Sequence, residues 1–419
     1  MIRQPPSNLL ACLRMTDSTV QTLLQIIQAQ KTPMLTLVKD WAQINSGSWN
    51  SAGLKLMLQT LQKAFTPLAD DCQILAAKPW LQLNQQGAFE TTLLGDSLLL
   101  SKRPNAKIKI LFMGHMDTVF GSDHPFQQVT ELDSNRLQGP GVADLKGGLV
   151  VLLNTLKIFE TLPEAQNIGW EILINADEEL GSRGSADHIL AAAKRNHLGL
   201  VFEPSLPDGS IVGERKGIGN FTVAVQGKAA HAGRDHALGR SAILALSEFT
   251  VLAESLNGTI PDVTLNVGKI SGGEAVNSVP AHAFCQIDVR VKHAGDFDSL
   301  NNHLQKLTVQ IAKKNDVKFV IDGGLNRPPK PLTESVQKIF AAYASIAKDL
   351  NLPLQLKPSG GCCDGNNLLA AGLPNLDTLG VRGGQIHSEA EHMFIDSLVE
   401  RTQLNTLFLR KLARGEFSL

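Results

Sequence analysis

The sequence predicts an α/β protein with a mostly parallel, mixed sheet flanked by helices and a smaller α+β unit inserted into it. In the first half, short apolar runs of strand length alternate with stretches of helical periodicity, which is typical of a largely parallel sheet. Near Gly213 the order changes to strand, helix, strand, strand, helix and strand. This βαββαβ order is typical of a two-layer sandwich built on an antiparallel sheet.

The larger sheet and its helices take up most of the chain before Gly213. Apolar residues recur about every 3.6 positions from Asp17 to about Leu61, with a break at Ser46-Gly47-Ser48, and residues 51–65 again have helical spacing. Strands are then expected at residues 91–100, 107–113, 170–176 and 199–202, and helices at residues 148–159 and 185–195.

The inserted unit and the return of the chain complete the predicted fold. Its strands are expected at residues 219–225, 263–270, 283–291 and 317–321, and its helices at 240–256 and 297–313. The segment Arg327-Pro328-Pro329-Lys330-Pro331 is typical of a hinge back to the larger unit. Helices at 333–350 and 364–371, a strand near 375–379 and a helix from about Asp396 follow. We therefore expect the inserted unit at residues 214–326 and the larger unit at residues 1–213 and 327–419.

Composition limits the partners and the compartment. The chain has 39 Lys and Arg and 40 Asp and Glu, a formal net charge of −1, which argues against a nucleic-acid or polybasic membrane surface. Five cysteines without a CxxC pair argue against a structural zinc knuckle and favour a reducing compartment. No run reaches the ~18 apolar residues that span a bilayer, and the apolar stretch at residues 9–13 is too short for a signal peptide. We expect a cytoplasmic protein.

Potential metal ligands repeatedly follow the ends of the predicted strands. In open α/β sheets, ligands bind just outside the carboxyl ends of the strands. One more candidate lies in a glycine-rich loop, residues 139–148, ahead of a helix. In chain order, the candidates are His115, Asp117, Asp144, Glu178, Glu179, Glu203 and His387.

Each candidate taken alone also has a structural interpretation. A lone His after a strand is more often a hydrogen-bonded structural residue. Asp144 could cap the helix that follows it, and Glu178 with Glu179 could be two solvated charges. Their joint occurrence at the strand ends of one sheet favours a common site.

Two His and three carboxylates form a mixed nitrogen and oxygen set that suits Zn²⁺, and also Mn²⁺ or Co²⁺. Five ligands are too many for one tetrahedral zinc and suit two metals about 3.5–4 Å apart that share a carboxylate. Such metals lower the pKa of bound water to roughly 7. A further carboxylate must then take the proton and pass it to a leaving amine. We therefore predict two divalent metal ions, with zinc first.

The motifs GHMDTV, GVADLKGG, DEELGSRGS, FEP, KAAHAG and HSE, in this order, resemble those of the dinuclear zinc peptidases and amidohydrolases. That family includes glutamate carboxypeptidase, acetylornithine deacetylase, succinyl-diaminopimelate desuccinylase and aminoacylase. The resemblance runs from about Ser46 to the C-terminus. It implies that His115 and His387 are terminal ligands of different metals and that Asp144 bridges the two. Glu203 would join His115, and Glu179 would join His387.

The same resemblance implies roles for two neighbouring acids and a special peptide bond. Glu178 would be the general base, and Asp117 would orient His115. The peptide bond between Asp144 and Leu145 would be cis.

The resemblance also implies that the inserted unit is a dimerisation or lid domain, so that the protein is a homodimer. His231, in Lys228-Ala-Ala-His-Ala-Gly, would enter the partner subunit's active site and stabilise the oxyanion. Without the resemblance, a loop His on a polar surface would be the simpler interpretation.

The substrate's free carboxylate would be held by residues of the inserted unit and of a glycine loop. Asn277 and Arg290 match the family's positions for this role, although Arg290 could instead pair with Asp288 or Asp296. Gly360 matches a glycine loop that lines the same pocket. There the family's usual Thr/Ser-Asp is replaced by Cys362-Cys363-Asp364, which changes that wall.

The resulting hypothesis is a metal-dependent hydrolase that cleaves the amide bond of an N-acyl amino acid or small peptide with a free carboxylate. A hydroxide held between the metals would attack, with Glu178 as its base. Ser46-Gly47-Ser48 and the stretch from Gly380 to His387 are most similar to glutamate carboxypeptidase. Acetylornithine deacetylase-like or desuccinylase-like deacylation is the alternative within the family. A metal-free, non-catalytic binding relative is the alternative outside enzymes, and the complete ligand set argues against it.

Overall fold

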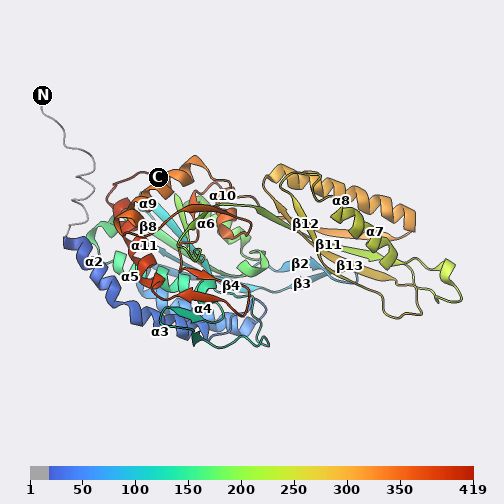
Figure 1. The fold of residues 1–419 in the computed structure, drawn as a ribbon, viewed down its shortest axis with the longest axis horizontal. Coiled ribbons are helices and arrows are strands. Elements are labelled where there is room, and N and C mark those ends of the chain that lie inside the picture. The colour runs from blue at the N-terminus through green and yellow to red at the C-terminus, as the bar shows by residue number, and fades with distance from the viewer. Residues whose placement is uncertain (1–17) are drawn as a thin grey trace, which may run out of the picture.

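The protein is described by a computed structural model that covers residues 18–419. The expected helix start at Asp17, Cys12 and the N-terminal segment considered for a signal peptide lie outside the described residues. Figure 1 shows a larger unit on the left, built on the main sheet, and a smaller unit on the right. Within residues 18–419 we find no helix with the length and apolar character needed to cross a membrane.

The main sheet has six strands in the order β1-β4-β8-β5-β9-β16. β8, β5, β9 and β16 run parallel, whereas β1 and β4 are antiparallel at one edge, so the predicted mixed, mostly parallel sheet is confirmed. The strands are β1 (Asp71–Leu75), β4 (Gly95–Lys102), β5 (Ile108–His115), β8 (Ile168–Ala176), β9 (Leu198–Val201) and β16 (Asn375–Leu376).

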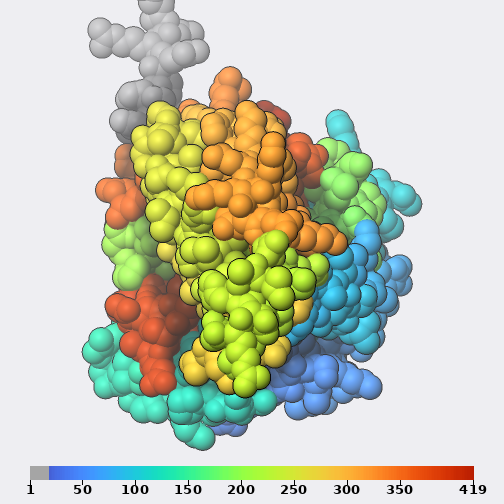
Figure 2. Space-filling view, turned by 90° about the vertical axis from the view of Figure 1, so that its right-hand side faces the viewer, coloured from blue at the N-terminus to red at the C-terminus, as the bar shows by residue number. Residues whose placement is uncertain are grey.

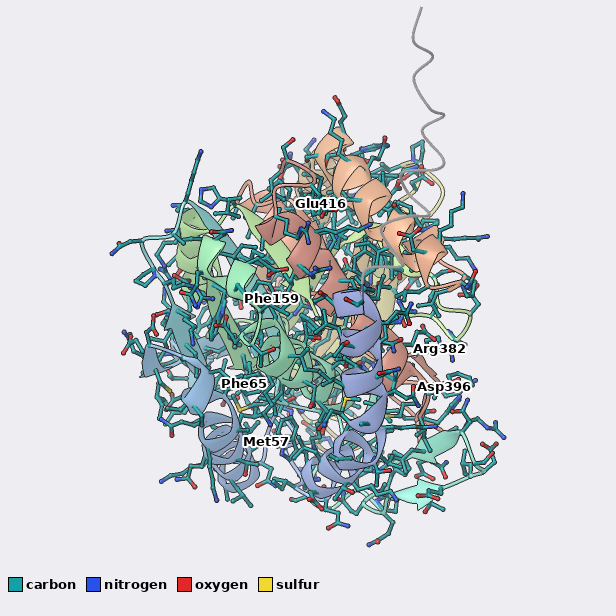
Figure 3. All side chains as sticks on the ribbon, turned by 90° about the vertical axis from the view of Figure 1, so that its left-hand side faces the viewer. Met57, Phe65, Phe159, Arg382, Asp396 and Glu416 are labelled. Carbon is teal, nitrogen blue, oxygen red and sulfur yellow. The ribbon has the colours of Figure 1, made fainter. Side chains whose placement is uncertain are left out.

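Helices cover both faces of this sheet because its strands are apolar on both sides. In β5, Ile110 and Phe112 face the larger core, whereas Leu111 and Met113 pack beneath α6 and α10. Phe65 and Phe159, labelled in Figure 3, belong to the larger core. The helices of the larger core are α2 (Ser18–Ala29), α3 (Lys31–Ala42), α4 (Ser51–Phe65), α5 (Gly148–Phe159), α9 (Glu334–Asp349) and α11 (Ser397–Ala413); those of the other face are α6 (Ala186–Arg195) and α10 (Asp364–Ala370).

The smaller unit has its own antiparallel sheet, in the order β12-β13-β11-β14. Alternate residues of each strand, such as Phe221 and Ile287, form a separate core with two helices. Its elements are β11 (Gly217–Gln226), α7 (Ala242–Glu254), β12 (Thr264–Gly272), β13 (His282–Val291), α8 (Ala294–Asn315) and β14 (Lys318–Arg327). The βαββαβ order is therefore confirmed, while the domain limits at residues 214 and 326 stay a prediction.

Short strands and turns complete the chain. The additional strands are β2 (Trp80–Leu83), β3 (Phe89–Thr92), β6 (Thr130–Glu131), β7 (Arg136–Gln138), β10 (Ile211–Arg215), β15 (Leu356–Ser359), β17 (Gly383–Gly384) and β18 (His392–Phe394). The short helices are η1 (Thr66–Leu68), η2 (Val142–Gly147), η3 (Pro163–Asn167), η4 (Glu178–Leu180) and η5 (His236–Leu238). The expectation of a single strand at residues 91–100 was wrong, because β3 pairs with β2 in a hairpin and only β4 joins the main sheet.

The β2–β3 hairpin leaves the larger unit and packs on the smaller one. Leu83 is buried against Ala224, Phe284 and Val320, and the Gln226 side chain donates a hydrogen bond to the hairpin backbone over 3.2 Å. In Figure 2 the light-blue surface of this part of the chain lies beside the yellow-green surface of the smaller unit. The hairpin therefore connects the two units across the cleft between them.

The two chain segments that connect the units are bonded to each other. Arg215 and Lys330 exchange backbone hydrogen bonds of 2.9 and 3.0 Å, and both side chains pair with Asp377, at 2.8 and 2.5 Å. Lys330 and Asp377 are fully buried. Burial alone would raise the pKa of Asp377, but the two cations lower it to about 2. The segment predicted as a proline hinge therefore also takes part in a buried ion-pair cluster, formed by Arg215, Lys330 and Asp377, that holds the two connecting segments together.

Asp377→Asn is expected to lower the free energy of unfolding by about 3–5 kcal/mol, because it leaves two buried cations without their shared anion. The measurement is the denaturant midpoint at pH 7. Asp208→Asn is the matched control, since Asp208 pairs with Lys357 at the exposed surface, where a pair contributes only about 0–1 kcal/mol. Equal shifts in the two variants would contradict a stabilising role for the buried ion pairs of Asp377.

Candidate metal centre

The structure brings together all five side chains that the sequence suggested as metal ligands. His115 Nε2 lies 3.1 Å from Asp144 Oδ1 and 3.9 Å from Glu203 Oε1. On the other side of the cluster, His387 Nε2 lies 3.5 Å from Asp144 Oδ2 and 3.1 Å from Glu179 Oε2. The two oxygens of Asp144 therefore face different His residues, as a bridging carboxylate requires.

The topology of the sheet explains this convergence. His115 ends β5, Glu179 lies in η4 just after β8, and Glu203 follows β9. These three strands are adjacent and parallel, so their carboxyl ends meet at one edge of the sheet. His387 comes from the loop between β17 and β18 and has a φ of 62°, a backbone conformation that is uncommon for a residue other than glycine.

The loop that carries Asp144 is held by a buried acid that the sequence analysis did not single out. The peptide bond between Asp144 and Leu145 is cis, which confirms the expectation. The Glu391 carboxylate accepts hydrogen bonds from the backbone N–H groups of Gly141, Ala143 and Asp144, at 3.2, 3.0 and 3.1 Å. Glu391 lies four residues after His387 in the chain, and this spacing was its only signal in the sequence.

Asp117 connects His115 to the turn that carries the two acids. It is fully buried and lies 3.3 Å from His115 Nδ1. Its carboxylate also accepts hydrogen bonds from the backbone N–H groups of Glu178 and Glu179, at 3.2 and 3.1 Å, and from Ser48 Oγ at 2.8 Å. Asp117 therefore sits where it can fix both the imidazole ring and the acidic turn.

Asp117→Asn is expected to raise the dissociation constant for Zn²⁺ about 10- to 100-fold, because carboxylates that orient a ligating His typically have effects of this size. Competition with a zinc chelator measures the change. Asp123→Asn, at an exposed acid of the loop that follows, should leave the affinity unchanged. An Asp117→Asn variant with wild-type affinity would contradict the orienting role.

The electrostatics of the cluster favour added positive charge. Burial, together with the charge of Asp144, raises the pKa of Glu203 to about 8. Burial also raises the pKa of Glu178, although the neighbouring Arg327 acts in the opposite direction. Three carboxylates and two imidazoles that converge in this way form a donor set that fits two divalent cations.

Arg327 is a site residue that sequence reasoning missed. Its Nη2 lies 2.8 Å from the Glu178 carboxylate and also donates to the Glu178 backbone carbonyl over 2.8 Å. A second acid, Asp364, lies 3.5 Å away. In the sequence, Arg327 only marks the start of a proline-rich linker, so nothing there connects it with Glu178.

A cavity of about 450 Å³ opens onto the cluster and contains some of the predicted substrate-binding residues. Glu178, Arg290 and Arg327 line it, as do Gly361, Cys362 and Cys363. Arg290 also pairs with Asp288 at 2.8 Å, as the alternative interpretation proposed, and its Nη1 donates to the Gly360 carbonyl over 3.4 Å. Arg290 and the glycine loop are thus brought together beside the candidate ligands.

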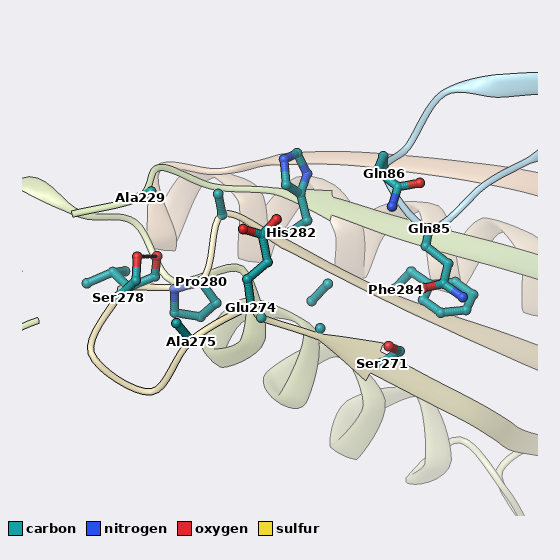
Figure 4. A pocket seen from close by; sticks show the side chains of 15 residues that line it. Gln85, Gln86, Ala229, Ser271, Glu274, Ala275, Ser278, Pro280, His282 and Phe284 are labelled. Carbon is teal, nitrogen blue, oxygen red and sulfur yellow. Dashed lines mark hydrogen bonds between the residues drawn. The ribbon is translucent and has the colours of Figure 1, made fainter. Parts of the chain in front are cut away.

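His231 and Asn277 lie elsewhere in the same chain. Neither lines this cavity within the part of the chain that the structure describes. They belong to adjoining loops of the smaller unit. His231 forms an isolated backbone β-bridge with Ser278, and the Asn277 carbonyl accepts a hydrogen bond from Ala232 N over 3.0 Å. Figure 4 shows part of this region, with Ser278 and Pro280 at one end and the hairpin residues Gln85 and Gln86 at the other.

A family model and several known proteins match this chain. The model for peptidase family M20/M25/M40 matches residues 111–411, which include all five candidate ligands. The chain belongs to this family. It is therefore a metallohydrolase that acts on amide or peptide C–N bonds, as the metallopeptidases and deacylases of the family do.

Two relatives indicate the breadth of the family around this chain. Carboxypeptidase G2 of Pseudomonas sp. (strain RS-16) is 29% identical over 327 residues, 77% of this chain and 78% of the relative. Succinyl-diaminopimelate desuccinylase of Nitrosospira multiformis is 26% identical over 337 residues, 75% of this chain and 87% of the relative. The predicted resemblance to dinuclear zinc peptidases and amidohydrolases is therefore confirmed at the level of the family.

Solved structures share the fold. A dinuclear metal binding peptidase of the M20 family from Bacillus subtilis superposes with a TM-score of 0.62 at 14% identity, covering 92% of this chain and 99% of the other. At this identity the likeness concerns the fold, including the sheet whose edge carries the cluster.

Proposed function

We propose that this M20 hydrolase removes an amino acid with a free carboxylate from an N-acyl amino acid or small peptide, as a carboxypeptidase does. One observation carries the proposal: the Asp144 carboxylate lies between His115 and His387 in a cavity that also holds Glu178 and Arg290. The five candidate ligands would hold two divalent metals, with zinc proposed first and cobalt or manganese as alternatives. Such metals polarise the scissile carbonyl and lower the pKa of water.

The residues of the chain supply proton transfer and binding. Glu178 accepts a proton from the attacking water and delivers it to the leaving nitrogen. Burial raises the pKa of Glu178 above that of an ordinary carboxyl, which suits a group that must both take and release a proton near neutral pH. Arg290 binds the free carboxylate of the amino-acid half through its bidentate guanidinium. Gly360 belongs to the loop beside it.

Two alternative functions remain. One is a hydrolase that removes a different acyl group, and the other is a binding protein without catalytic activity. A deacetylase or desuccinylase would use the same ligands and base, and the desuccinylase relative favours keeping it as the second candidate. A metal-free binding relative would have no need for the convergent ligand set and Glu178. A screen of N-acyl amino acids and dipeptides with Zn²⁺, Co²⁺ and Mn²⁺ tests the proposal. No turnover of any of them would reject it.

We also propose a homodimer formed through the smaller unit. β12 lies at the edge of its sheet, and α7 exposes the apolar side chains of Ile243, Leu244 and Val251. A second copy would cover both features. His231 and Asn277, which lie outside the metal cavity of their own chain, would then serve the partner's cavity, where His231 stabilises the oxyanion and Asn277 helps to bind the substrate. We keep a cytoplasmic location as a prediction.

Two inactive variants should restore activity to each other when they are mixed. In a 1:1 mixture of His231→Ala and Glu178→Gln chains, each mixed dimer has one intact site and one site with both defects. Random exchange should therefore recover about a quarter of the wild-type activity per protomer. The measurement is turnover after subunit exchange, with each variant alone as the control. No recovery in a mixture shown to contain mixed dimers would contradict the shared site.

A further inference from the structure

A second cavity lies on the same face of the smaller unit as Arg290. In β13, Ile287 packs toward α7 and α8, whereas Asp288 and Arg290 point away from these helices, in keeping with the period of two in a strand. Asp288 lines the second cavity and Arg290 lines the metal cavity. Their ion pair of 2.8 Å marks the boundary between the two spaces.

The second cavity measures about 360 Å³, which is within the usual range of ligand sites. The larger unit contributes Trp80 from the β2–β3 hairpin, together with Leu180 and Arg183, which follow the candidate ligand Glu179. Trp80 also stacks on Trp49, with ring centroids 6.5 Å apart. Space for a substrate group therefore exists directly beside the candidate metal centre.

Arg183 is the unusual member of this wall. Its guanidinium carbon lies 5.6 Å from the centroid of the Trp80 ring. Within residues 18–419 it makes no hydrogen bond and no ion pair, and its Nε is buried without a partner. Burial, assisted by the charge of Arg327, lowers the pKa of Arg183. Arg183 is half-buried, and buried polar atoms are normally hydrogen-bonded, so the unpartnered Nε beside the cavity indicates a missing acceptor.

The remaining charges leave this cavity positive. The carboxylate of Asp288 is already engaged by Arg290. Lys269 contacts the Phe284 ring and forms no ion pair within the described chain. Asp322 faces Arg183 from β14 but lies beyond ion-pair distance of it. Two cations and one uncommitted acid favour an anionic ligand over a neutral or cationic one.

We propose that this cavity is the subsite for the acyl half of the substrate and that Arg183 binds a carboxylate at the far end of the acyl group. The inference rests on the proposed function, in which Arg290 already holds the carboxylate of the amino-acid half. The acyl half then extends past the Asp288–Arg290 pair, with its apolar stem against the Trp80 ring. The free N–H groups of Arg183 receive the terminal carboxylate as a bidentate pair.

Two isosteric substrates isolate the charge of the acyl group. One is the N-glutaryl derivative of the amino acid preferred in the screen, and the other carries a terminal carboxamide in place of the terminal carboxylate. Arg183→Gln should lower kcat/KM for the glutaryl substrate about 10- to 100-fold, the range expected for charge-assisted hydrogen bonds. It should change that of the carboxamide less than about threefold, and Arg183→Lys should recover part of the loss. Equal losses on both substrates, or no loss on either, would overturn the proposal.

Asp322→Asn is the matched control for a role in docking the two units. If Arg183 binds substrate, removing the acid opposite it should raise kcat/KM for the glutaryl substrate about two- to fivefold and leave the carboxamide unchanged. If Arg183 and Asp322 instead serve to hold the units together, the variant should lower kcat/KM for both substrates. That second result would overturn the subsite.

A direct binding measurement tests the proposed subsite independently of the proposed hydrolysis. Glutarate should change the tryptophan fluorescence of the wild-type protein, because Trp80 lines the cavity, and the change should be lost in Arg183→Gln. If the wild type cleaves neither substrate, the proposed function fails while this experiment still decides the subsite. Absence of the glutarate effect in the wild type, or its persistence in Arg183→Gln, would overturn the inference.

Discussion

Replacing Glu178 with Gln is expected to lower kcat about 10²- to 10⁴-fold while both metals stay bound. The amide has the shape of the carboxyl group but cannot accept the proton of the attacking water. Glu178 is absent from the contacts among the five candidate ligands, and its carboxylate faces Arg327 at 2.8 Å. Its substitution should therefore affect proton transfer and spare the metal ligands.

The measurement combines turnover of the zinc-loaded enzyme with elemental analysis of the bound metal. Glu171→Gln is the matched control, because Glu171 lies on β8, the strand that leads to Glu178, and pairs with Arg195 at the surface, away from the cluster. It should retain wild-type turnover. A Glu178→Gln enzyme that keeps wild-type turnover would remove Glu178 from the role of base.

Removing the metals is expected to abolish hydrolysis and to lower the thermal stability of the protein. His115, Asp144 and Glu203 crowd together, and burial with the charge of Asp144 already raises the pKa of Glu203 to about 8. Bound cations would offset the repulsion between the negative charges of these carboxylates. A ligand present at 1,000 times its dissociation constant stabilises the folded state by about 4 kcal/mol. The protein should therefore melt at a lower temperature after chelation.

Activity and melting temperature are followed through chelation and the return of Zn²⁺, Co²⁺ or Mn²⁺. The metal that restores the highest activity at equal occupancy identifies the best cofactor. Mg²⁺ is the control ion, because it prefers all-oxygen ligands and octahedral geometry to a set with two imidazoles. Full activity in a protein shown to be metal-free would reject the metal-dependent mechanism.

Much of the fold could be predicted because local patterns determined it. The apolar runs of β5, β8 and β9 show where strands buried on both faces must lie, and the alternation in β11 and β13 marks strands with one covered face. The hairpin was missed because β3 and β4 are separated by only two residues, Leu93 and Leu94, which are apolar and do not signal a turn. Only pairing with β2 distinguishes β3 from the main sheet.

The candidate ligands could be predicted because topology constrains them strongly. The carboxyl ends of neighbouring parallel strands lie at the same edge of the sheet. A residue that directly follows such a strand must therefore lie at that edge, close to the residues that follow the neighbouring strands. Arg327 and Glu391 had no such constraint. Each reaches the cluster from a segment distant in sequence, and only the packed structure shows that Arg327 meets Glu178 and that Glu391 holds the Asp144 loop.

The sequence by itself determined the alternation of strands and helices, the family motifs and the set of side chains able to bind two metals, since these follow from the order and spacing of residues along the chain. Only the tertiary structure decided which charges are paired. Asp377 is enclosed by Arg215 and Lys330, whereas Arg183 is left without a partner beside Trp80. Ion pairing depends on separations of a few ångströms between segments that are far apart in sequence, and the pattern of residues along the chain does not specify such distances.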